Sequence, residues 1–282
     1  MTAIAIQQII EDVKDLPTLP AVVMELLNSL DNDDVDTHEL ALKVTHDSAL
    51  TAKTLRYANS AYYSTLIKVT TIQQAISLLG LTTVRQIITT AALTGCFPEN
   101  NCPGFNHKDF WRHSNAVAIA AKILARRLNL NQDVAFTAGL LHDIGTLVLV
   151  TYHSAQYAAA ITYAQEQKCT QFEAERRLLG IDHAAVGNAL AEEWNFSDQM
   201  KKAIAGHHQP DEPGLGFLAT IIHVANGIAH ALQATASDDD EDVRPEVSAL
   251  SWESLGMDQA ALTEVLAEVQ IEFDKLNTQV DI

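Results

Sequence analysis

The sequence predicts an all-α protein, a multi-helix bundle of two packed helical lobes. Apolar residues recur at three- and four-residue spacing along almost the whole chain, which is the period of an amphipathic helix. Ala, Leu, Gln and Glu, which favour helices, are abundant, and no pair of segments has the alternating pattern of paired strands. The chain has 282 residues, 48% of them hydrophobic, and is long enough to bury a large core.

Start and stop signals divide residues 1–98 into the helices of an N-terminal lobe. The prolines of "LPTLP" (16–20) can begin a helix but cannot continue one. An Asp or Thr cap followed by Glu39 is a capping-box-like start, and Gly80 is typical of a helix end. Helices are predicted over 21–30, 36–47, 48–61, 71–80 and 82–96.

A break in the helical pattern separates a second helical lobe, residues 99–236, from the first. The break is "CFPENNCPGFN" (96–106), with two prolines, a glycine and three asparagines. Residues 237–282 form the third part: an acidic linker (237–246), then an amphipathic helix (258–278) whose apolar stripe is expected to dock back on the body. Helices of the second lobe are predicted over 107–128, 132–152, 159–167, 172–180, 183–194, 198–208 and 216–232.

The charge of the chain restricts its ligands. Thirty-six acidic residues face 18 basic ones, for a formal charge of −18. Such a surface repels phosphate backbones and anionic lipids, so neither a nucleic-acid polymer nor a membrane is expected as a partner. A phosphate-bearing ligand would need a local cation, either a metal ion or a small basic patch.

The chain is expected to be cytoplasmic. No apolar stretch is expected to approach the roughly 20 residues of a membrane span, and "MTAIAIQQIIEDVKDLP" lacks the basic segment and cleavage-like site of a signal peptide. Three sparse cysteines (Cys96, Cys102 and Cys169) suit a reducing compartment as free thiols.

Six ionisable side chains and one amide of the second lobe are candidate metal ligands. "GLLHDIG" (139–145) places a histidine and an aspartate inside a predicted helix, and burying that charge is costly unless something pairs with it. A metal ion would neutralise it; a wet groove or a buried His–Asp hydrogen bond are the alternatives. Each residue alone is typical of a structural or surface position, but together they follow the ligand order of a helical metallohydrolase. They are His113, His142, Asp143, His183, His207, His208 and Asn226. His38, His46 and His153 have no such partners and are expected at the surface.

Two sets of motifs carry a family resemblance. "GLLHDIG", with His113 before it and the other histidines after it, resembles the HD superfamily of metal-dependent phosphohydrolases. "LPTLPAVVMELL", "HDSALTAKTLRYANSAYY" and "TIQQAISLLGLTTVRQII" resemble the HDOD family, the HD-related output domain of bacterial signalling proteins. The resemblance implies an all-helical fold and a bacterial cytoplasmic context. It does not imply catalysis, because many family members lack the metal ligands. Asn59 and Ser60 of this block are expected to make structural hydrogen bonds.

By this resemblance, two metal sites share Asp143. Neutral imidazoles and a carboxylate suit a divalent transition metal (iron, zinc, manganese or nickel), bound as one or two ions. Such an ion activates water near neutral pH and holds phosphate oxygens, with His142 and Asp143 as the catalytic pair. The first site would comprise His113, His142, Asp143 and Asn226, and the second Asp143, His183, His207 and His208.

Three positions depart from the pattern of active relatives. The last carboxylate is replaced by Asn226, which removes a negative charge from the first site but keeps a neutral oxygen ligand. Relatives that cleave cyclic di-nucleotides have a lysine after "HDIG" and a glutamate after the paired histidines, where this chain has Thr146 and Gln209. These departures disfavour hydrolysis of cyclic di-nucleotides.

Two functions are consistent with these observations. The first is a bacterial HDOD signal-transduction module that retains a metal site and has weak or absent hydrolysis. The alternative is an active metal-dependent phosphohydrolase acting on a nucleotide or phosphoester. No receiver, kinase or cyclase domain is recognisable in the sequence, so signalling proteins are expected to act on it in trans.

Overall fold

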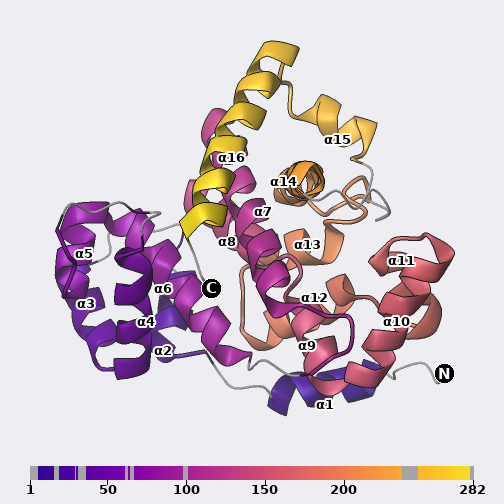
Figure 1. Ribbon diagram of the computed structural model, residues 1–282, viewed down its shortest axis with the longest axis horizontal. Coiled ribbons are helices and arrows are strands. Elements are labelled where there is room, and N and C mark those ends of the chain that lie inside the picture. The colour runs from indigo at the N-terminus through magenta and orange to yellow at the C-terminus, as the bar shows by residue number, and fades with distance from the viewer. Residues whose placement is uncertain are drawn as a thin grey trace. The chain divides into compact units, whose positions relative to one another are not determined.

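The protein is all-helical, as predicted (Figure 1). A computed structural model describes residues 6–15, 19–28, 30, 36–60, 63, 67–97, 101–236 and 247–279, and this part of the chain contains helices and no strand. Contacts divide the chain into two units. Unit 1 is Met1–Leu16 with Glu99–Gln270, and unit 2 is Pro17–Pro98 with Ile271–Ile282.

Unit 2 is a small helical cluster around helix α6. The side chain of Asp36 accepts hydrogen bonds from two backbone N–H groups of the first turn of α3, as the predicted cap requires. Gly80, at φ 83°, separates α5 from α6. Helix α6 packs against α2, α4 and α5. The helices are α2 (Ala21–Asn28), α3 (Thr37–Thr45), α4 (Ser48–Ala58), α5 (Ile72–Leu79) and α6 (Leu81–Cys96).

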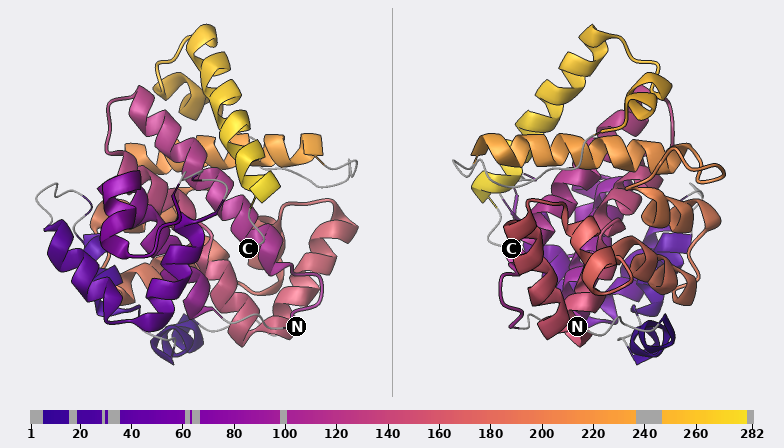
Figure 2. Two further views of the ribbon diagram at one scale, coloured as in Figure 1. Left: turned by 60° about the vertical axis from the view of Figure 1, so that its left-hand side comes forward. Right: turned by 90° about the vertical axis from the view of Figure 1, so that its right-hand side faces the viewer.

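Three sets of helix–helix contacts hold unit 1 together. Helix α7 packs against α8 and α14, helix α12 packs against α9 and α13, and α10 joins α9 to α11. Figure 2 shows α14, in orange, as a long helix that crosses α7. The helices are α1 (Ile6–Asp15), α7 (His107–Arg127), α8 (Gln132–Leu141), α9 (Ile144–Tyr152), α10 (Ser154–Gln167), α11 (Gln171–Leu178), α12 (His183–Glu193), α13 (Asp198–Gly206), α14 (Phe217–Ala236), α15 (Ala249–Ser254) and α16 (Gln259–Gln279), the last of which runs into residues grouped with unit 2.

The segment around "GLLHDIG" differs from its prediction in two ways. The predicted helix over 132–152 is interrupted: α8 ends at Leu141 and α9 begins at Ile144, so His142 and Asp143 lie at a break between helices. The stretch Gln132–Tyr152 is also apolar and long enough, by length and composition, to cross a membrane, which the sequence analysis missed. In its most apolar 18-residue window, 89% is buried inside the protein, as in a core segment.

The N-terminal helix α1 is linked to the rest of unit 1 by a buried His–Asp hydrogen bond. His153 Nε2 lies 2.6 Å from Asp12 Oδ2, and both side chains are about one-tenth exposed. The expectation that His153 lies at the surface was therefore wrong. Helix α1 packs against α9 and α12, and the buried carboxylate supplies the partner that a buried imidazole needs.

The C-terminal helix carries the apolar stripe that was expected. Val265, Val269 and Phe273 are buried, and Arg127 of α7 pairs with Glu264 of α16 at 2.8 Å. The predicted acidic linker, 237–246, lies outside the described residues, as do residues 98–100 of the predicted seam. The three-part division at 98/99 and 236/237 stays a prediction.

Asn59 holds two segments of unit 2 together, as expected for this motif. Its Nδ2 donates to the carbonyl oxygens of Leu55 (2.8 Å) and Val69 (2.7 Å), and its Oδ1 accepts the Val69 N–H (2.8 Å). The amide thus acts as a surrogate peptide group that pairs with Val69 across ten residues of chain. Ser60 does not join it: its buried hydroxyl has no hydrogen-bond partner among the described residues.

Replacing Asn59 by Ala should destabilise unit 2 by about 2–3 kcal/mol, because both polar backbone groups of Val69 lose their partner. Ser60→Ala is the matched control and should change the stability by less than about 0.5 kcal/mol. Urea denaturation of the full chain, with hydrogen exchange at the Val69 amide, measures both. Equal effects of the two substitutions would contradict this role of Asn59.

Candidate metal centre

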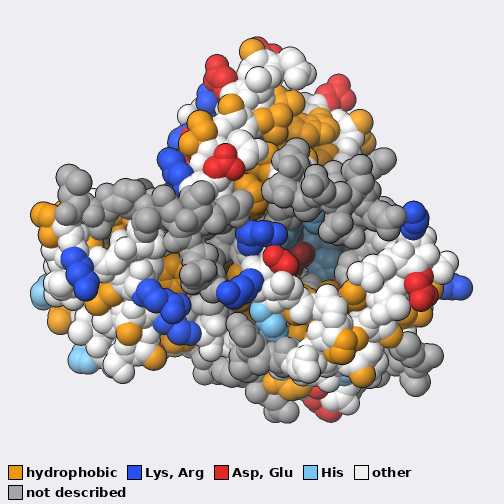
Figure 3. Space-filling model, viewed as in Figure 1, with side chains coloured by type: hydrophobic (Ala, Val, Ile, Leu, Met, Phe, Trp, Pro, Cys, Tyr) orange, Lys and Arg blue, Asp and Glu red, His pale blue; other side chains and the backbone are white. Residues whose placement is uncertain are grey.

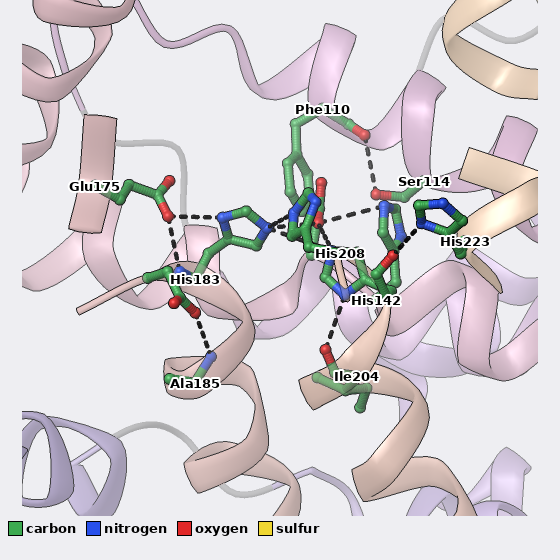
Figure 4. Close-up of polar contacts among 12 residues, drawn as sticks. Phe110, Ser114, His142, Glu175, His183, Ala185, Ile204, His208 and His223 are labelled. Carbon is green, nitrogen blue, oxygen red and sulfur yellow. Dashed lines mark hydrogen bonds and ion pairs between the residues drawn. The ribbon is translucent and has the colours of Figure 1, made fainter. Parts of the chain in front are cut away.

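The candidate ligands come from the ends of several helices of unit 1. His113 lies within α7, and His142 and Asp143 occupy the break between α8 and α9. His183 is the first residue of α12, and His207 and His208 follow directly after α13. Figure 4 shows several of these imidazoles pointing toward one another.

One carboxylate oxygen lies at the centre of this cluster. Asp143 Oδ1 is 3.3 Å from His142 Nε2 and 3.2 Å from both His183 Nε2 and His207 Nε2. Asp143 occupies the N-cap position of α9, where an aspartate normally accepts a hydrogen bond from the first helical turn. Its side chain makes no such cap and is directed at the histidines instead.

The other ring nitrogen of each of these histidines is already bonded. His142 Nδ1 donates to the carbonyl oxygen of Gly139 and His207 Nδ1 to that of Ile204, both at 2.8 Å. His183 Nδ1 donates to Glu175 Oε2 at 2.7 Å. Because an oxygen acceptor fixes a proton on Nδ1, Nε2 is the nitrogen that each ring presents to the cluster.

Lone pairs that face a carboxylate repel one another unless a cation lies between them. Neither His142 Nε2 nor Asp143 Oδ1 has a hydrogen-bond partner among the described residues, although both atoms are buried. Two ligands bound at about 2.1 Å to one ion lie about 3.0–3.4 Å apart, which matches the spacing around Asp143. The donor set therefore fits a divalent transition metal.

Two groups of ligand atoms share Asp143. In each group, one donor atom per residue lies within 4.8 Å of all the others, and the groups are Asp143, His183, His207 and His208, and His113, His142 and Asp143. In the first group, His208 Nε2 is 2.8 Å from His183 Nε2, a separation that requires a proton or a cation between the two nitrogens.

Burial and neighbouring charges keep most of the side chains in the cluster in the protonation state that binds a metal ion. Burial alone would raise the pKa of Asp143, but His142 and His183 outweigh it and hold that pKa well below its usual value. Burial lowers the pKa of His207 to about 4 and that of His208 well below its usual value. For His183, the carboxylates of Glu175 and Asp143 outweigh burial and raise the pKa. Near neutral pH, Asp143 is thus ionised, and His207 and His208 are neutral, as metal ligands must be.

Asn226 lies on α14 with its Oδ1 buried and without a hydrogen-bond partner among the described residues. His230, one turn later on the same helix face, packs its ring 4.5 Å from that of His113, which directs this face toward the cluster. His223 is engaged elsewhere: its Nδ1 donates to the His207 carbonyl (2.7 Å), and its Nε2 accepts the Ser248 N–H (3.0 Å). His223 therefore supports the His207 turn and has no nitrogen left for a metal.

Two glycines allow the helices that carry the ligands to approach one another. A Cβ on Gly139 would lie 2.8 Å from Ala118 Cα of α7, so α8 and α7 touch there at their backbones. A Cβ on Gly145 would overlap the carbonyl oxygen of His183 and the backbone nitrogen of Gly187. The glycine of "HDIG" thus brings α9 against the start of α12, where His183 lies.

Glu175, which is fully buried and bonded to His183, is not among the site residues predicted from the sequence. Its helix, "QFEAERRL", reads as a polar surface segment, because Glu173, Arg176 and Arg177 surround it. The only clue in the sequence was that Glu175 lies eight residues before His183. A turn interrupts the helix between these two residues, so helical spacing could not predict their contact.

Solvent reaches the cluster at one side. His142 and His207 are fully buried, whereas the Asp143 side chain is 21% exposed. In the space-filling view, histidine side chains are visible at the bottom of a hollow (Figure 3). Asp143 is thus partly exposed to solvent at this side, although its Oδ1 is buried.

A helical lobe in which a His–Asp pair at a helix break meets histidines from three other helices is an HD-type domain. The HDOD domain family matches residues 16–210 of the chain, and the protein belongs to this family.

Solved structures with the same fold cover nearly the whole chain. An HDOD domain protein of unknown function from Geobacter sulfurreducens is 27% identical with a TM-score of 0.77, covering 96% of this chain and 99% of that one. A protein named as a putative phosphohydrolase from Shewanella amazonensis SB2B is 31% identical with a TM-score of 0.72, covering 95% and 97%.

Curated relatives are longer proteins that this chain matches in part. An uncharacterized protein of Treponema pallidum is 22% identical over 71% of this chain, and ribonuclease Y of Lactobacillus gasseri is 27% identical over 58%. The chain spans 39% of the first protein and 26% of the second.

If the cluster binds metal, His142→Ala and Asp143→Ala should each lose bound metal and the stabilisation that metal gives. An ion present at 100 times its dissociation constant stabilises the folded state by about 2.7 kcal/mol. Elemental mass spectrometry and melting curves with added Zn²⁺ measure the two effects, and His46→Ala, an exposed histidine of unit 2, is the control. If the wild type purifies without metal, and neither a chelator nor Zn²⁺ changes its melting temperature, the buried His–Asp hydrogen bond is the correct interpretation.

Gly145→Ala should destabilise the chain by about 3 kcal/mol or more and weaken Zn²⁺ binding, because the added Cβ meets rigid backbone on α12. Gly95→Ala is the matched control, since the only close atom there is the flexible end of Lys53, 2.7 Å away. The helix preference of alanine should make that variant neutral or more stable by up to about 1 kcal/mol. Denaturation and Zn²⁺ titration of both variants decide the matter, and a fully stable Gly145→Ala protein would refute the close approach.

Proposed function

We propose that the protein is an HDOD signal-transduction module that holds one or two divalent transition metal ions (iron, zinc, manganese or nickel) and has weak or absent hydrolytic activity. One observation carries the metal-binding part of this proposal. The buried Asp143 Oδ1 lies 3.2–3.3 Å from three Nε2 atoms whose rings are fixed by hydrogen bonds at Nδ1.

The residues present supply two unequal sites around the shared carboxylate of Asp143. His183, His207 and His208 would complete one site, and His113, His142 and Asn226 the other. A divalent ion supplies Lewis acidity toward a phosphate oxygen and toward water. The protein's own contribution is to hold the imidazoles in their ligand form and to keep one side of Asp143 open to solvent.

The charge of the site argues for weak or absent hydrolysis. Two divalent ions bring four positive charges, and Asp143 is the only carboxylate among the seven candidate ligands. Asn226 provides a neutral oxygen where a carboxylate would balance part of this charge. The site with His113 and His142 is therefore expected to bind its ion more weakly than the other.

The signalling part of the proposal rests on membership of the HDOD family. The proposed partners are signalling proteins that act in trans, and the proposed small ligand, if one binds, is a nucleotide or phosphoester. Such a ligand would have to approach the cluster through the solvent-exposed side of Asp143, since His142 and His207 are fully buried.

An active phosphohydrolase is the second candidate. The 31% identity to the Shewanella protein, over 95% of this chain, favours it, as do the matches to ribonuclease Y. An assay with bis(p-nitrophenyl) phosphate and added Mn²⁺ or Zn²⁺ separates the two candidates. Robust turnover by the wild type that His142→Ala abolishes would favour the enzyme, whereas robust turnover that survives His142→Ala would contradict the site itself.

Asn226→Asp should raise the number of bound ions per chain toward two and increase turnover of the aryl phosphodiester, because it restores a negative charge to the weaker site. The side chain keeps its size, so the fold should be unaffected. Elemental analysis and initial rates, compared with Asn188→Asp on α12 as a control, test this. An unchanged metal content would refute the role given to Asn226.

A further inference from the structure

A carboxylate that no ligand assignment includes lies directly behind the cluster. Glu175, on α11, is fully buried. Burying a carboxylate is costly unless its oxygens are paired. Glu175 Oε1 nevertheless has no hydrogen-bond partner among the described residues.

That other oxygen makes two hydrogen bonds to a single residue. Glu175 Oε2 accepts the backbone N–H of His183 at 2.8 Å and the ring Nδ1–H of His183 at 2.7 Å. The same carboxylate therefore fixes the main chain at the first residue of α12 and the rotation of its imidazole (Figure 4). The free N–H groups and the dipole at a helix N-terminus also favour a negative charge there.

Among the three rings around Asp143 Oδ1, only that of His183 donates to a carboxylate. His142 and His207 donate to neutral backbone carbonyls. A carboxylate behind an imidazole increases the electron density on the opposite nitrogen and adds one negative charge near the metal. His183 should therefore be the strongest of the three imidazole donors.

We propose that Glu175 is the positioning residue of this metal centre: it directs His183 Nε2 at Asp143 and makes the group with His183, His207 and His208 the tighter of the two sites. This inference rests on the proposed metal site. It also supplies what the ligand set lacks, since Glu175 places a second negative charge close to an ion that Asp143 alone would poorly neutralise.

The test is the affinity of the full chain for Zn²⁺, measured by competition with a chelator. Glu175→Gln keeps the shape and one acceptor oxygen but removes the charge, and it should weaken Zn²⁺ binding about ten- to hundred-fold. Glu173→Gln, the same change two residues away on the exposed side of α11, should leave the affinity unchanged. The melting temperatures of the metal-free proteins separate lost affinity from lost fold.

A second measurement uses the wild type and avoids any folding defect. In ¹⁵N spectra of the imidazoles, the Zn²⁺-loaded chain should show His183 protonated at Nδ1 and bound through Nε2, with a downfield Nδ1–H resonance. Coordination through Nδ1 would overturn the inference, as would equal Zn²⁺ affinities of wild type and Glu175→Gln. If the wild type binds no Zn²⁺ at all, the proposed metal site fails first, and with it this inference.

Discussion

The convergence of three imidazole nitrogens on one buried oxygen of Asp143 is the interaction around which the central helices of unit 1 are arranged. Three imidazole nitrogens lie 3.2–3.3 Å from one carboxylate oxygen, and hydrogen bonds at the far side of each ring keep them there. A buried carboxylate of this kind needs positive charge beside it, which a proton on His183 or a metal ion can supply. The packing of α8, α9, α12 and α13 brings these groups together, and the proposed metal ion would balance their charge within the folded unit.

Charge balance connects this cluster to the unusual features around it. Asn226 removes a carboxylate from one side, and Glu175 adds one behind the other side. The protein as a whole is strongly acidic, with a formal charge of −18. Under the proposed function, this imbalance would make unequal the two sites that the ligand order alone would treat as equivalent.

The local parts of the structure could be predicted from the sequence, and the long-range parts could not. Helix periodicity, the cap at Asp36 and the stop at Gly80 depend on neighbouring residues, so the all-α class followed directly. The break at His142 and Asp143 was missed, because the apolar residues on both sides continue a helical pattern while tertiary contacts interrupt it. The pairing of His153 with Asp12 spans 141 residues and leaves no periodic signature.

The hydrogen bonds at Nδ1 also determine how the site would behave during metal exchange. Because folding already fixes each ring, an arriving ion does not have to gather flexible side chains, and the entropic cost of ordering them falls on folding rather than on binding. Such a centre would distinguish metals by size and preferred geometry more strictly than a flexible one, so the fixed rings, and not only the composition of the cell's metal pool, would determine which ion the protein carries.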